Sequence, residues 1–156
     1  SGCSSGSNAT PTHTPALASS PTVVATTSSS DITPVPTLLP GVDPGIAARV
    51  RTTMRAFLDA YNAGDIDAAY NFYSDCAKKK NEVTKEQLRF GRTATGTLTL
   101  LGVEVLSTSD TAATARIETR SLIFVGNQNH FKVTTHFALE DGKWKIDAAK
   151  PDQCGR

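Results

Sequence analysis

The sequence lacks the features that define several common classes of protein. None of its 156 residues belongs to an apolar run of about 18 residues, so no segment is predicted to cross a bilayer as a helix. The formal net charge is only +1, which excludes the strong positive field of a general nucleic-acid binder. With 38% hydrophobic residues, the chain is apolar enough to fold, and its length allows one domain and a tail.

The shortage of apolar residues is concentrated in residues 1–42. This segment holds 9 Ser, 8 Thr and 6 Pro, one acidic residue (Asp31), and no Lys, Arg or aromatic residue. Such a composition cannot bury enough apolar surface to offset the entropy lost on ordering. We therefore predict that residues 1–42 form a disordered Ser/Thr/Pro-rich tether, partly extended by its prolines.

Cys3 lies in the run Ser-Gly-Cys-Ser-Ser-Gly, which resembles the end of a bacterial lipobox. In that motif small residues precede a cysteine that carries the lipid, and a polar tether follows it. We therefore predict that Cys3 is lipidated and that the protein is an extracytoplasmic lipoprotein of the cell envelope, held at the membrane through this anchor alone. A secreted protein without an anchor is the alternative, because Ser7-Asn8-Ala9 also resembles the remnant of a protease tag.

Residues 43–156 show the regular patterns of a folded domain. Asp43 is a good N-cap and Pro44 suits the first position of a helix, where a missing N–H costs nothing. Apolar residues then recur at helical spacing as far as Tyr61, and Gly64 can end the helix. The pattern predicts an amphipathic helix with one face in a core.

The rest of the domain is predicted to add two short helices and then strands. A second helix is predicted over residues 67–74, and the capping-box sequence that begins at Thr84 predicts a third. After this the apolar period changes to two, which predicts strands over residues 97–107, 112–125, 130–140 and 143–149. This order predicts an α+β fold, with helices packed on a curved, mainly antiparallel sheet of four to five strands.

The segment from Ala56 to Asp75 resembles the opening of the nuclear transport factor two-like superfamily. It has a long helix, an Ala-Gly-Asp break at residues 63–65 and a second helix that ends in aromatic residues. Trp144 lies where the last strand of these domains commonly carries a tryptophan. The resemblance spans about residues 45–150 and implies a cone-shaped, cystatin-like fold. Its members include isomerases, dehydratases, dimerising modules and inert scaffolds, so it does not specify a function.

The resemblance also implies a cone whose mouth can hold a small molecule. We expect the lining of this pocket to include aromatic and inward-facing residues, namely Phe57, Tyr61, Tyr70, Tyr73, Phe131, Thr135, Phe137 and Trp144. Ketosteroid isomerase-like members use a tyrosine, which Tyr61 or Tyr70 could match, and two carboxylates. Because no acidic residue falls on a predicted inward strand position, we assign no catalytic residue.

No metal site or cofactor is predicted. His130 and His136 share the polar face of one predicted strand, and no third ligand lies at a useful spacing. If Cys3 carries a lipid, Cys76 and Cys154 remain as an even pair in an exported protein. We therefore predict a Cys76–Cys154 disulfide, with two free thiols as the alternative.

Together these patterns favour a non-enzymatic exported lipoprotein. Its cone would bind either a small apolar ligand or a partner protein of the envelope, and a homodimer could form through the open face of the sheet. The alternative is an isomerase- or dehydratase-type enzyme of the same superfamily. The cone lining separates the two, because buried titratable groups beside a tyrosine would favour the enzyme.

Overall fold

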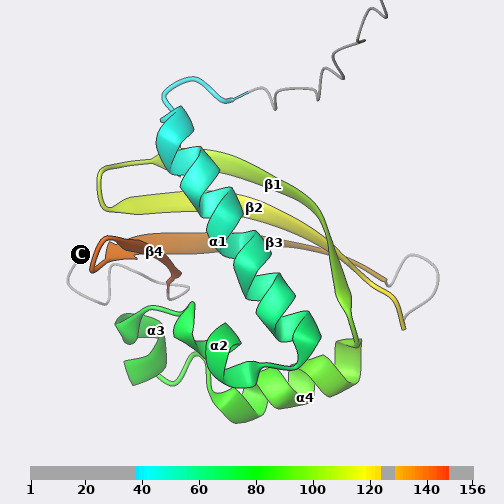
Figure 1. Cartoon of the computed structure of the whole chain (residues 1–156). Coiled ribbons are helices and arrows are strands. Elements are labelled where there is room, and N and C mark those ends of the chain that lie inside the picture. The colour runs from blue at the N-terminus through cyan, green and yellow to red at the C-terminus, as the bar shows by residue number, and fades with distance from the viewer. Residues whose placement is uncertain (1–37, 124–128, 148–156) are drawn as a thin grey trace, which may run out of the picture. The chain divides into compact units, whose positions relative to one another are not determined.

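The computed structural model describes residues 38–123 and 129–147, which form four helices followed by four strands (Figure 1). Cys3, Cys154 and the predicted tether up to residue 37 lie outside the described residues. The elements are α1 (Pro44–Ala63), α2 (Ile66–Asn71), α3 (Asp75–Lys79), α4 (Lys85–Thr95), β1 (Leu98–Thr108), β2 (Ala112–Ser121), β3 (His130–Glu140) and β4 (Lys143–Ile146).

The long helix α1 begins and ends as its sequence predicts. Asp43 is the N-cap, and its Oδ1 accepts a hydrogen bond of 2.7 Å from the N–H of Ile46. Gly64 ends the helix with a φ of 79°, a conformation that costs a glycine little. The face that packs against the sheet is formed by Ala47, Val50, Met54, Phe57, Leu58 and Tyr61, all of them buried.

The second predicted helix is shorter in the structure, because the chain after Asn71 pairs with the last strand. The N–H of Ile146 donates to the carbonyl of Phe72 and the N–H of Ser74 donates to the carbonyl of Ile146, both at 2.8 Å. Ser74 then starts α3, a helix that the sequence analysis did not predict. This parallel bridge joins the helical layer to the edge of the sheet.

The third predicted helix is α4, which begins at the predicted capping box. The N–H of Thr84 donates to Gln87 Oε1 at 2.7 Å, and the N–H of Gln87 donates to Thr84 Oγ1 at 3.1 Å. Each side chain therefore satisfies an amide that the helix leaves unpaired.

The four described strands form one antiparallel sheet in the order β1-β2-β3-β4, which confirms the predicted α+β class. In the pairing of β2 with β3, Ile117 lies opposite Val133 on the face toward α1. The opposite face is charged, with Arg116 Nη1 2.9 Å from Glu104 Oε2 and Lys132 Nζ 3.3 Å from Glu118 Oε2. This alternation is typical of a sheet with one buried and one solvated face.

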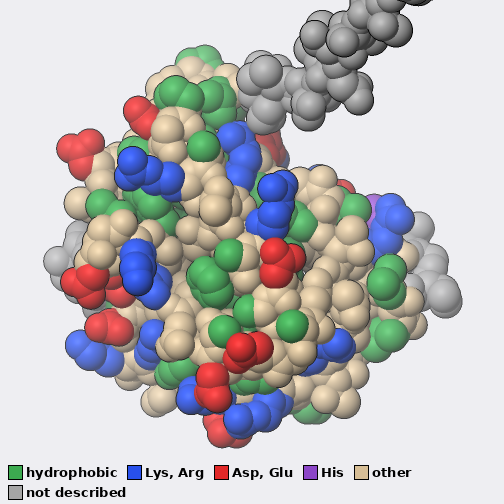
Figure 2. Space-filling view, in the orientation of Figure 1, with side chains coloured by type: hydrophobic (Ala, Val, Ile, Leu, Met, Phe, Trp, Pro, Cys, Tyr) green, Lys and Arg blue, Asp and Glu red, His purple; other side chains and the backbone are tan. Residues whose placement is uncertain are grey.

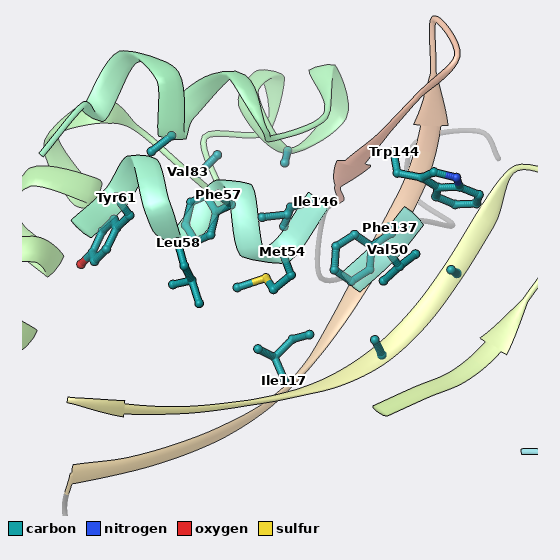
Figure 3. Packing of buried hydrophobic residues seen from close by; sticks show 14 of the residues in the cluster. Val50, Met54, Phe57, Leu58, Tyr61, Val83, Ile117, Phe137, Trp144 and Ile146 are labelled. Atoms are coloured by element: carbon teal, nitrogen blue, oxygen red, sulfur yellow. The ribbon is translucent and has the colours of Figure 1, made fainter. Parts of the chain in front are cut away.

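The hydrophobic core lies between α1 and the concave face of the sheet (Figure 3). Phe137 and Ile117, each 1% exposed, are the largest fully buried side chains from the sheet. Within the described part of the chain, no helix is both long enough and apolar enough to cross a membrane.

Candidate functional site

A cavity of about 200 Å³ lies between α1 and the concave face of the sheet. Val133 on β3 belongs to its wall and is 54% exposed, so the cavity opens to solvent at this strand. We refer to this space as the cone cavity. Its described lining consists of Met54, Phe57, Leu58, Tyr73, Leu98, Ile117, Thr119, Val133, Thr135 and Ile146.

An aromatic cluster stiffens the helical wall of the cone cavity. The ring of Phe57 lies 5.5 Å from that of Tyr73, nearly edge-on at 88°. Phe57 also contacts Tyr61 at 5.9 Å and Phe72 at 6.4 Å between ring centroids. Edge-to-face and tilted pairs at these separations are favourable for aromatic quadrupoles. Phe57 is therefore contacted by three aromatic rings within the helical wall.

Three hydroxyl groups interrupt the apolar lining, from Tyr73, Thr119 and Thr135. Burial, with a smaller contribution from the neighbouring Tyr61, raises the pKa of Tyr73 to about 12. The phenol is therefore protonated at neutral pH and can donate a hydrogen bond. The described lining of the cone cavity contains no carboxylate and no imidazole, so its chemistry is that of an apolar recess with a few hydroxyls.

Acidic groups lie in an adjoining recess of about 210 Å³, which shares Tyr73 and Thr135 with the cone cavity. Its wall includes Glu82, His136 and Asp147. His136 Nδ1 and the hydroxyl of Thr114 lie 3.2 Å apart and form a hydrogen bond. The tautomer of the imidazole decides which of the two groups is the donor.

Asp147 is a buried carboxyl group that the sequence analysis did not identify. Ser74 Oγ donates a hydrogen bond of 2.5 Å to Asp147 Oδ1 and accepts one of 3.0 Å from the N–H of Ala77. The predicted strand over residues 143–149 included Asp147, but β4 ends at Ile146, and Asp147 is buried just beyond it.

Four of the eight residues expected in the pocket lie in or beside the cone cavity. Phe57, Tyr73 and Thr135 belong to its wall. Tyr61 is buried behind Phe57, and its hydroxyl lies 3.4 Å from that of Thr95 on α4.

The other four expected residues lie elsewhere in the domain. Phe137 is buried in the core, and Phe131 is half-buried opposite Thr119 on the pairing of β3 with β2. The ring of Tyr70 lies under the ammonium groups of Lys78 and Lys85, 5.1 and 5.6 Å from its centroid. Trp144 lines a different groove, between α1 and β4.

Only one of the two cysteines of the predicted disulfide lies among the described residues. Cys76 is buried in α3, whereas Cys154 lies outside the described residues, so the disulfide stays a prediction. Among residues 38–123 and 129–147, no three His, Cys, Asp or Glu side chains are grouped so that they could hold a metal ion.

Comparison with known proteins identifies the fold. No protein-family model matches this sequence, and no curated protein matches it either. A protein with a cystatin-like fold from Nostoc punctiforme superposes with a TM-score of 0.53 at 6% identity, over 68% of this chain and 89% of that chain. An NTF2-like protein of unknown function from Pseudomonas putida KT2440 superposes with a TM-score of 0.52 at 14% identity, over 68% and 84%.

The chain therefore has the fold of the NTF2-like and cystatin-like proteins, where NTF2 denotes nuclear transport factor two. This confirms the predicted resemblance at the level of the fold. At these identities the likeness concerns architecture alone, so the function must be argued from the cavity.

Proposed function

We propose that this domain is a non-catalytic binding module of an exported lipoprotein, and that the cone cavity takes a small apolar molecule with one hydrogen-bonding group. The observation that carries the proposal is the cavity itself, whose described lining is apolar except for three hydroxyl groups. Such a lining favours a ligand through the apolar surface it buries, while the hydroxyls orient one polar atom.

The size of the cavity limits the ligand to a single ring. A dry cavity of roughly 150 Å³ is large enough to bind benzene. The cone cavity, at about 200 Å³, has room for a ring with one or two small substituents. For a ligand of about eight non-hydrogen atoms, typical efficiencies correspond to a Kd of about 0.1–1 mM.

Tyr73 supports binding rather than proton abstraction. Because burial raises its pKa to about 12, the phenol is not a base at neutral pH. It is suited to donate a hydrogen bond to a carbonyl, ether or phenol oxygen of the ligand.

The adjoining recess is the one feature that favours the alternative, an isomerase- or dehydratase-type enzyme. Glu82, His136 and Asp147 line that recess, on the other side of the shared residues Tyr73 and Thr135. A ligand that extended past Tyr73 would approach Glu82 and Asp147, whereas the imidazole of His136 is bonded to Thr114 on the other face of the sheet. The enzyme hypothesis predicts a chemically altered ligand, whereas the binding module returns its ligand unchanged.

The single methionine of the chain provides a direct test of the proposed site. Met54 lines the cone cavity, so a ¹³C-methyl label on methionine gives one signal at the site. We expect 4-methylphenol to shift this signal saturably at millimolar concentration. Recovery of the probe by mass spectrometry should show it unaltered.

Two tryptophan substitutions serve as test and control. Val133→Trp places a large ring at the mouth and should abolish the shift, whereas Leu122→Trp alters another exposed apolar residue, outside the described lining, and should preserve it. A Met54 methyl signal that does not shift when 4-methylphenol is added, or one that shifts equally in both variants, would contradict binding in the cone cavity.

The anchor is tested separately on the native protein from membranes. The support for it is the lipobox-like run around Cys3 and the Ser/Thr/Pro-rich composition of residues 1–42. Mass spectrometry should find Cys3 as the first residue, bearing a thioether-linked diacylglycerol. A peptide with unmodified Ser1-Gly2-Cys3 would contradict the lipoprotein assignment.

A further inference from the structure

We propose that the groove between α1 and β4 is a second binding site, which takes a monocarboxylate with an apolar body. This groove encloses about 420 Å³ and is lined by residues of α1, by Phe72 and by residues 142–145. It shares no described lining residue with the cone cavity. Its volume lies within the roughly 300–1,000 Å³ of typical small-molecule sites.

The first observation is a buried hydrogen-bond donor without an acceptor. Trp144 is 6% exposed, and its indole Nε1 has no hydrogen-bond partner. Among the described residues it is the only buried side-chain nitrogen or oxygen in this condition. Buried N–H groups are nearly always paired, so this donor indicates that an acceptor comes from outside the chain. Figure 3 shows the indole nitrogen in the part of the core where Val50 and Phe137 also lie.

The second observation is the charge around the groove. Arg49, Lys143 and Lys145 belong to the lining, and the described lining contains no acidic side chain. Figure 2 shows basic and acidic side chains interspersed over this side of the domain, so the absence of an acidic side chain from the groove lining is a local feature. Three cations without a carboxylate among them favour an anionic ligand, and arginine can bind a carboxylate with two parallel hydrogen bonds.

Lys145 shows that the local field is positive. Its Nζ donates a hydrogen bond to the carbonyl of Asn71. Burial lowers the pKa of Lys145 and repulsion from Lys78 and Lys143 lowers it further, while Glu140 and Asp75 offset only part of this effect. A carboxylate in the groove would offset this repulsion.

The remaining lining is apolar and suits the body of the ligand. Ala48 and Ala56 present small side chains on α1, and Phe72 contributes an aromatic ring. Small residues on a helix leave room for a flat or chain-like group against it. The ligand class is therefore an aromatic or aliphatic acid, with its carboxylate toward the cations and its body over the alanines.

Access to the indole requires side chains to move. Nε1 is sealed from solvent in this structure, so an acceptor reaches it only when the lining opens. Arg49 and Lys143 are exposed, and their long side chains can change rotamer at little cost. In the bound state one carboxylate oxygen accepts the indole N–H and the other faces Arg49.

The chain contains one tryptophan, so a ¹H–¹⁵N spectrum of the folded protein has one indole signal to follow. We expect naphthalene-2-carboxylate to move this signal downfield and to slow its exchange with solvent. The neutral isostere naphthalene-2-carboxamide should bind about tenfold more weakly, because it lacks the charge. Saturating 4-methylphenol in the cone cavity should not displace the carboxylate.

A matched pair of arginine substitutions separates the groove from general surface charge. Arg49 and Arg55 are both exposed on α1, but only Arg49 is in the described groove lining. Arg49→Ala should weaken carboxylate binding about tenfold, and Arg55→Ala should leave it within about twofold. An indole signal that is unmoved by the carboxylate, equal affinity for the carboxamide, or equal losses in both variants would overturn the proposal.

Discussion

Replacing Ser74 by alanine tests how one hydroxyl joins α3 to the end of β4. Ser74 is fully buried, donates to Asp147 and caps α3 at the N–H of Ala77. Loss of an N-cap costs about 1 kcal/mol, and loss of a hydrogen bond to a charged group costs about 1.5–3 kcal/mol. We therefore expect Ser74→Ala to lower the free energy of unfolding by about 2.5–4 kcal/mol.

Urea denaturation followed by the fluorescence of the single tryptophan measures this loss. Thr84→Ala is the matched control, since Thr84 caps α4 in the same way but donates to no buried carboxylate in the described structure. We expect the control to lose about 1 kcal/mol. Equal losses in the two variants would refute the argument that the contact with Asp147 stabilises the fold.

Three further predictions concern the core, the cysteines and the Tyr73 phenol. Phe137→Ala removes a fully buried ring and should destabilise the domain by about 3–5 kcal/mol in the same denaturation assay. If Cys76 and Cys154 form a disulfide, alkylation of the unreduced protein should modify neither of them. Reduction should lower the free energy of unfolding by about 4 kcal/mol. Two alkylated thiols in folded, unreduced protein would contradict the disulfide. Burial raises the pKa of Tyr73 from 10.0 to about 12, so the unfolded chain loses this proton first. Stability should therefore fall as the pH rises from about 10 to 12, and Tyr73→Phe should remove that part of the fall.

The sequence predicts the elements whose causes are local. Asp43, Gly64 and the capping box at Thr84 act within a few residues of themselves, so α1 and α4 begin or end where these residues indicate. The period-two pattern over residues 130–140 likewise matches β3, because alternation depends only on which face is buried.

The sequence does not predict features that depend on a distant partner. Helix α2 ends early because Phe72 and Ser74 bond to Ile146, more than 70 residues further along the chain, and no local propensity records that contact. The burial of Asp147 likewise depends on a distant residue, because Ser74 Oγ donates a hydrogen bond to its carboxyl group. The sequence predicted an apolar and aromatic lining for the cone, and it assigned Trp144 to that lining. In the structure α1 crosses β4, and Trp144 lines the groove between them instead.

The bridge between Phe72–Ser74 and Ile146 has a consequence for self-association. A free edge strand offers unpaired amides and carbonyls to another chain and can seed cross-β stacking. At Ile146 both backbone groups are already occupied, and the ammonium group of Lys145 beside it resists an incoming strand. The bridge therefore blocks the addition of a further strand at Ile146, which limits polymerisation through this edge of the sheet.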